Sequence, residues 1–171
     1  MYWRFEIIKP DWRKKALTFL LYIFLLAPLA SAQTKQKAEK DFVKELNSIL
    51  KTSKEQHWSY NGIMTIDSAF AINEKGVLSV AVRYRDDDSS VVRTRMDAPV
   101  NKISRIAYDL YLILEYKQDE VTVYESEVNS KELKETHKTN YFHIGAPVKD
   151  GYYQQEKLQQ LLDKVLKYYT N

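Results

Sequence analysis

The sequence predicts an α+β domain in which an N-terminal and a C-terminal amphipathic helix flank one antiparallel, meander-like sheet of about five to six strands. Three observations support this fold class. Apolar residues recur at helical spacing before residue 55 and again after residue 153. Between these two segments, apolar and polar residues alternate with the period of two that is typical of half-buried strands.

Residues 1–32 read as a secretory signal peptide. Basic side chains precede the short apolar run 16–27, and the small residues Ala30, Ser31 and Ala32 follow it, which is the order of parts in such a peptide. A retained membrane anchor is the alternative, but the run is shorter than the ~20 residues that span a bilayer. We therefore expect cleavage after Ala32, export to the periplasm or secretion, and one soluble domain over 33–171.

The positive net charge of the chain comes from residues 1–32. The formal net charge is +3, and residues 1–32 contain five basic and two acidic side chains, so the remainder is balanced. The composition therefore gives no support for a nucleic-acid partner or for membrane contact after cleavage. There is no cysteine, so disulfides and thiol-based metal or redox chemistry are excluded. We expect no cofactor.

The first helix is predicted over 37–54. Its apolar face consists of Ala38, Phe42, Val43, Leu46, Ile49 and Leu50. The segment His57-Trp58-Ser59-Tyr60 ends this helix and leads into a first strand over 63–72.

A hairpin connects the first strand to a second strand over 77–85. Its loop is Glu74-Lys75-Gly76, with glycine at the position that needs a left-handed backbone. This register places Ile72 opposite Leu78 and Phe70 opposite Val80, and the larger apolar residues then share one side of the sheet.

The third strand is predicted over 90–96, after a turn at Asp86-Asp87-Asp88. A five-residue loop would place Arg83 directly opposite Arg93, whereas a three-residue loop places Arg83 opposite Val91. Like charges that face each other destabilise a strand pair, so the shorter loop is favoured. The aspartates are interpreted as turn residues rather than as a calcium loop, because the alternating ligands and trailing glutamate are missing.

A long strand beginning at Arg105 is predicted to be the centre of the sheet. Its apolar face consists of Ile106, Tyr108, Leu110, Leu112, Leu114 and Tyr116. A turn within 117–120 should return the chain to a strand over 121–125 that pairs with it. Residues 127–139 read as a polar, mobile connection with one helical turn at 130–135.

The C-terminal part is predicted to contain a short strand over 141–144 and a final helix over 153–169. The apolar stripe of this helix consists of Leu158, Leu161, Leu162, Val165 and Tyr169.

Four arginines and several tyrosines are expected on the sheet face that points away from the helices. The cluster consists of Arg83, Arg93, Arg95 and Arg105, beside Asp67, Asp109, Tyr111, Glu115 and Tyr124. Guanidinium groups next to tyrosines can bind a carboxylate, sulfate or phosphate. The simpler interpretation is a solvated face with cross-strand ion pairs.

Trp58 and Tyr60 form the second candidate site. An exposed pair of this kind could stack on a sugar or anchor a protein partner. The alternative, which residue statistics favour, is that Trp58 closes one end of the core.

We therefore expect a non-catalytic binding module with a protein or an anionic ligand as partner. Two other functions stay open: a small hydrolase with an acid–base site near His143 and Asp109, and self-association through Tyr111 and Ile113. The histidines His57, His137 and His143 lack metal-ligand spacing, so no metal site is expected. Nucleophile and glycine-rich phosphate motifs are absent from the sequence as well.

Overall fold

The computed structural model describes residues 12–147 and 149–169, with side chains from residue 34 onward. The chain divides into two units, residues 1–36 and 37–171. Residues 1–11 of the predicted signal peptide lie outside the described part, and its remainder forms the beginning of helix α1 (Trp12–Gln56). In the part of the chain described with side chains, no helix is long and apolar enough to cross a membrane.

Helix α1 and the final helix confirm both predicted amphipathic segments. Phe42, Leu46, Ile49 and Leu50 of α1 are buried, as are Leu158, Leu162 and Val165 of helix α2 (Gly151–Leu166). Asp150 caps the start of α2, where its side chain accepts a hydrogen bond from the backbone N–H of Tyr153 at 3.0 Å.

Eight antiparallel strands lie between the helices in the second unit. They are β1 (Met64–Ile72), β2 (Val77–Arg85), β3 (Val91–Pro99), β4 (Ile103–Asp109), β5 (Tyr111–Tyr116), β6 (Val121–Ser126), β7 (Leu133–Thr139) and β8 (Tyr141–Gly145). A short 3-10 helix, Val100–Lys102, connects β3 to β4. The α+β class with antiparallel strands is thus confirmed.

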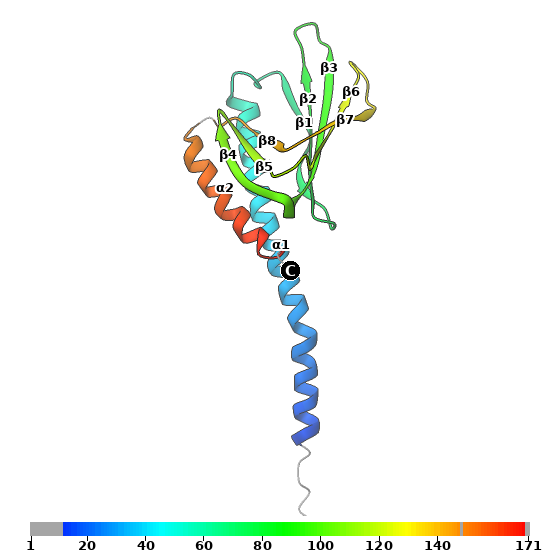
Figure 1. The fold of residues 1–171 in the computed structure, drawn as a ribbon, viewed down its shortest axis with the longest axis vertical. Helices are drawn as coiled ribbons and strands as arrows, with labels where there is room; N and C mark the ends of the chain where they lie inside the picture. Colours follow the sequence, from blue (N-terminus) through cyan, green and yellow to red (C-terminus); the bar gives the residue numbers. More distant parts are fainter. Residues whose placement is uncertain (1–11, 148, 170–171) are drawn as a thin grey trace, which may run out of the picture. The chain divides into compact units, whose positions relative to one another are not determined.

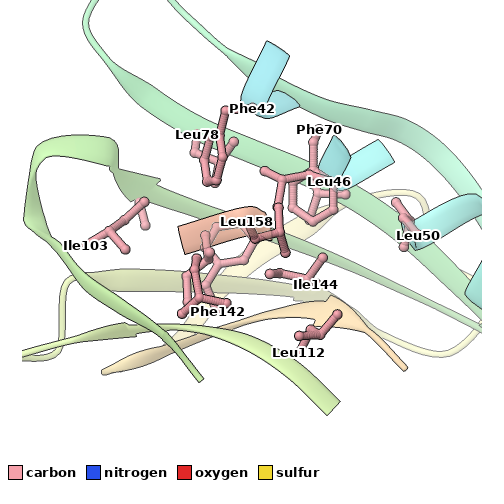
Figure 2. Packing of buried hydrophobic residues seen from close by; sticks show 14 of the residues in the cluster. Phe42, Leu46, Leu50, Phe70, Leu78, Ile103, Leu112, Phe142, Ile144 and Leu158 are labelled. Carbon is pink, nitrogen blue, oxygen red and sulfur yellow. The ribbon is translucent and has the colours of Figure 1, made fainter. Parts of the chain in front are cut away.

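These strands form two sheets rather than one. The order is β1-β2-β3-β6-β7 in the five-stranded sheet and β4-β5-β8 in the three-stranded sheet. The two sheets and both helices are labelled in Figure 1. Side chains from all four components meet in one core, and Figure 2 shows Phe42 and Leu46 of α1, Leu158 of α2, Leu78 of β2 and Phe142 of β8 gathered there.

The predicted long central strand is in fact a tight hairpin. Asp109 lies opposite Tyr111, so the chain reverses at Leu110, which has a φ of 61° and is 76% exposed. The predicted apolar face is otherwise kept, because Ile106 faces Leu114 and Tyr108 faces Leu112 across the hairpin.

The next strand also pairs differently from the prediction. β6 lies between β3 and β7 and makes no pair with β5, so residues 117–120 cross from one sheet to the other. The segment 127–139 contains strand β7, an exposed edge strand with a polar side-chain pattern, where a mobile connection was expected. The backbone of β7 pairs with that of β6, although most side chains of β7 are exposed.

The β1–β2 hairpin is confirmed near its turn. Ile72 faces Leu78, and Gly76 has the left-handed φ of 74°. Further along, the register shifts between Ser68 and Ala71, so Phe70 lies in an irregular stretch and not in a regular pair with Val80. The side chain of Asn47 bonds the backbone of Phe70 there, which the strand pattern alone does not predict.

The predicted β2–β3 loop length is wrong. Arg85 faces Val91 and Arg83 faces Arg93, so the loop contains the five residues 86–90. The carboxylate of Asp67 offsets the facing charges, with oxygens 3.1 Å from Nε of Arg83 and 3.9 Å from Nε of Arg93. Within the loop, Asp88 accepts a bond from the N–H of Ser90 at 2.8 Å, and this bond lowers the pKa of the Asp88 carboxyl group.

Candidate functional site

A pocket of about 410 Å³ lies between the two sheets. Strands β1, β2 and β3 supply one wall, β5 and β8 supply another, and Leu50 of α1 closes part of it. Most of its lining is apolar: Leu50, Met64, Phe70, Val80, Val82, Met96 and Ile144. Ligand sites are commonly clefts of ~300–1,000 Å³ with apolar walls and a few polar groups, so this pocket has the size and chemistry of one.

The alternation along β2 and β3 explains why these residues line the pocket. Val80, Val82 and Tyr84 point inward from β2, and Thr94 and Met96 point inward from β3. The residues between them point to the other face of the sheet, where Arg83, Arg93 and Arg95 lie. One strand pair therefore builds both candidate sites.

Polar groups are concentrated in a few half-buried pocket residues: Tyr60, Tyr84, Thr94, Tyr111 and His143. The ring centroids of Tyr60 and Tyr84 are 6.4 Å apart, and those of Tyr111 and His143 are 5.3 Å apart. Among the described groups of the chain, none forms a hydrogen bond with these five side chains. Their donors and acceptors are available to a ligand.

Burial favours the uncharged forms of three pocket side chains, those of Tyr60, Tyr84 and His143. Burial raises the pKa of Tyr60 to about 12, and the nearby Tyr84 and Tyr111 add to this rise. Burial and Tyr111 raise the pKa of Tyr84. Burial also lowers the pKa of the His143 imidazole, which favours the neutral ring.

The predicted residues Tyr60 and Tyr111 lie in this pocket, but Trp58 does not line it. Trp58 is 83% exposed, so it does not close an end of the core. Its ring lies 5.7 Å from that of His57, which in turn lies 5.4 Å from that of Tyr60. Trp58 is thus an exposed side chain two ring contacts away from a pocket residue.

The predicted arginine cluster is only partly assembled. Arg83 and Arg93 share Asp67, and Arg93 also donates to the carbonyl oxygen of Ser130. Arg95 binds Asp97 with two hydrogen bonds of 2.9 and 2.7 Å and lies over the Tyr124 ring. Each guanidinium therefore already has an acidic partner, as in the cross-strand ion-pair interpretation.

Arg105 does not join this group. It lies on β4 of the other sheet, where it pairs with Glu115 of β5. Asp109 and Tyr111 are in that sheet too, and Tyr111 turns toward the pocket. The separation follows from the division of the strands into two sheets, because β4 pairs with β5 and not with β3, and a period-two pattern cannot reveal strand partners.

The hydrolase hypothesis requires a carboxylate that orients His143. In the described part of the chain, the contacts of the His143 ring are with the rings of Tyr111 and Tyr141, and no acidic side chain bonds it. Asp109 is an exposed residue at the β4–β5 turn.

Sequence reasoning missed Tyr84, Thr94 and Met96 as site residues. Tyr84 is in phase with the inward residues Val80 and Val82, and a large polar ring in that position was a usable signal. Comparisons of the chain with protein-family models, with curated proteins and with solved structures found no match. The fold and the pocket are the basis for the function proposed below.

Proposed function

We propose that residues 37–171 form a non-catalytic binding module that takes a small apolar molecule into the pocket between the two sheets. The observation that carries this proposal is the largely apolar pocket of about 410 Å³ between the two sheets, which borders the hydrophobic core. Ligand sites are usually clefts with apolar walls and a few polar groups, and an exposed apolar cleft of this size is best explained by a ligand that covers it.

The polar and ion-paired surface of the five-stranded sheet supports this choice indirectly. Arg83 and Arg93 share Asp67, and Arg95 is paired with Asp97, whereas the pocket side chains have open hydrogen-bonding groups. An anionic ligand at the outer face would have to compete with ion pairs that are already formed. The pocket offers a ligand both buried area and free polar groups.

Fluorescence of an uncharged apolar dye, N-phenyl-1-naphthylamine, tests the proposal on the purified protein. Met96 lines the pocket and is half-buried, so Met96→Trp should fill the space and weaken dye binding by about ten-fold or more. Arg95→Trp is the matched control, because it adds the same ring one residue away on the opposite face. Equal dye binding by both variants would place the dye elsewhere and contradict the proposal.

We also propose that the chain is exported and that residues 1–32 are removed. This rests on the order of basic, apolar and small residues in the leader. The intact mass of the protein recovered after export should correspond to a chain that begins at Gln33. Recovery of the full mass from a membrane fraction would instead support the retained anchor.

A further inference from the structure

The polar groups of the pocket come from separate elements but converge. Tyr60 belongs to the segment after α1, Tyr84 to β2 and Tyr111 to β5. The rings of Tyr60 and Tyr84 have centroids 6.4 Å apart, and Tyr111 lines the same pocket. Three phenol groups thus meet at one space, and none of them has a hydrogen-bond partner among the described residues.

Among the described residues, no charged side chain lines the pocket to balance an ion. Its described lining includes neither lysine nor arginine, and neither aspartate nor glutamate. His143 is the one basic group among the described lining residues, and its ring contacts those of Tyr111 and Tyr141. A charged head group beside these half-buried side chains would lose part of its hydration without an opposite charge in return, so the site favours an uncharged group.

The size of the pocket limits the ligand further. Its volume of about 410 Å³ is roughly two to three times that of the ~150 Å³ cavity that holds one benzene. A chain of about ten carbon atoms with one small polar group is therefore a suitable probe.

We infer, on the basis of the proposed function, that the ligand is an uncharged amphiphile whose apolar chain ends in one hydroxyl or carbonyl group. The hydroxyls of Tyr60, Tyr84 and Tyr111 bind that group, and the apolar walls bind the chain. A neutral phenol can both donate and accept a hydrogen bond, so it suits an alcohol or a carbonyl oxygen equally. A carboxylate of the same length has the wrong charge for this site.

Displacement of N-phenyl-1-naphthylamine by 1-decanol and by decanoate at pH 7.5 tests the inference, because decanoate is then ionised. Decanol should displace the dye at a concentration at least ten-fold lower than decanoate. Decanol is also intrinsically more apolar, so the decisive comparison is between protein variants. The triple variant Tyr60→Phe, Tyr84→Phe, Tyr111→Phe keeps the ring volumes and should bind decanol roughly ten-fold more weakly, with unchanged dye affinity.

Single variants cover the case in which the triple variant does not fold. Each of Tyr60→Phe, Tyr84→Phe and Tyr111→Phe should weaken decanol binding by roughly two-fold or more. Tyr141→Phe is the control, since this tyrosine contacts His143 without lining the pocket. Unchanged decanol affinity in the variants, or equal displacement by decanoate, would overturn the inference while dye binding still supported the pocket. Absence of dye binding by the unaltered protein would instead overturn the proposed function.

Discussion

The backbone of Phe70 is bonded by a side chain from a helix. The N–H of Phe70 donates to Oδ1 of Asn47 at 2.8 Å, and Nδ2 of Asn47 donates to the carbonyl oxygen of Phe70 at 3.0 Å. These bonds occur where the register of the β1–β2 ladder shifts, so Phe70 has no regular cross-strand pair. The carboxamide offers one donor and one acceptor, as a peptide group of a neighbouring strand would.

Replacing Asn47 by alanine should therefore destabilise the fold. The N–H and C=O of Phe70 would lose their partners beside a side chain that is only 2% exposed. The expected loss in the free energy of unfolding is about 2–4 kcal/mol, measured by urea denaturation. Lys44→Ala, at an exposed position of the same helix, should change it by less than about 0.5 kcal/mol. Similar effects of the two substitutions would contradict this role of Asn47.

His143 should make stability depend on pH. Because burial lowers its pKa below the ordinary 6.5, the unfolded chain binds a proton at a higher pH than the folded domain does. The contribution of His143 to the free energy of unfolding is therefore complete above pH 6.5 and is lost as the pH falls toward the folded-state pKa.

Urea denaturation between pH 7.5 and 5 measures this effect. The free energy of unfolding should fall by at most about 1.4 kcal/mol per pH unit from this residue. His143→Gln should reduce the slope, whereas His137→Gln on the exposed strand β7 serves as the control. An unchanged slope in His143→Gln would show that other groups cause the dependence.

At the scale of the elements, the β2–β3 strand pair shows why the rule against facing like charges predicted the wrong register. Arg83 and Arg93 face each other, and Asp67 from the irregular part of β1 lies within ion-pair distance of both. A rule for two strands does not include a carboxylate from a third strand. With Asp67 of β1 included, the local electrostatic interaction is attractive instead of repulsive.

The substitution Asp67→Asn should therefore leave the repulsion between Arg83 and Arg93 uncompensated and lower the free energy of unfolding. We expect a loss of about 1 kcal/mol at low ionic strength, since all three side chains are partly exposed. The loss should shrink in 1 M NaCl, where the Debye length falls to about 3 Å. Asp87→Asn in the exposed β2–β3 loop is the matched control for removal of one negative charge. A loss that does not respond to salt would argue against an electrostatic cause.

Strand identity and inward-facing residues were largely predictable, because burial imposes a period on each element. The inward phase of Ile106, Leu112 and Leu114 was correct even though the strand breaks at Leu110. A hairpin with a single-residue turn preserves the period of two, so the pattern cannot distinguish it from one long strand. Strand β7 was missed for the opposite reason, since a pattern of exposed polar residues contains no burial signal.

At the scale of the whole molecule, strand partners could not be predicted. β6 follows β5 in the chain but pairs with β3, because residues 117–120 cross between the sheets. Consecutive strands pair in most proteins, so a meander was the reasonable expectation. The pocket follows from this crossing, because it lies between walls that belong to different sheets, and no local pattern encodes such a space.

One contact joins three distant segments of the folded unit. Tyr169, after α2, donates to Oε1 of Glu39 on α1 at 2.6 Å, and its ring covers Gly76 in the β1–β2 turn. A Cβ atom at Gly76 would lie 2.8 Å from Cε1 of Tyr169. The turn therefore needs glycine for both its backbone angle and its space.

Gly62 supplies a matched control for that contact. It has a φ of 78°, close to the 74° of Gly76, but nothing lies within 4 Å of its Cβ position. Gly62→Ala should cost about 1–2 kcal/mol from the backbone alone. Gly76→Ala should cost about 1–3 kcal/mol more, because Tyr169 must move. Equal changes in thermal stability would show that the Tyr169 contact contributes little.

Helix α2 has a role beyond its buried leucines. The side chain of Gln159 accepts a hydrogen bond from the backbone N–H of Ile106 at 2.8 Å, and the side chain of Gln155 donates one to the carbonyl oxygen of Ile106 at 3.0 Å. Ile106 lies on β4, an outer strand of its sheet, while the pocket lining includes no residue of α2. Removal of α2 would leave the peptide groups of Ile106 open to a strand of a second copy, and the core would also lose Leu158, Leu162 and Val165. In the folded unit, the side chains of Gln155 and Gln159 take the place on this part of the sheet edge that the backbone of a neighbouring strand would otherwise occupy.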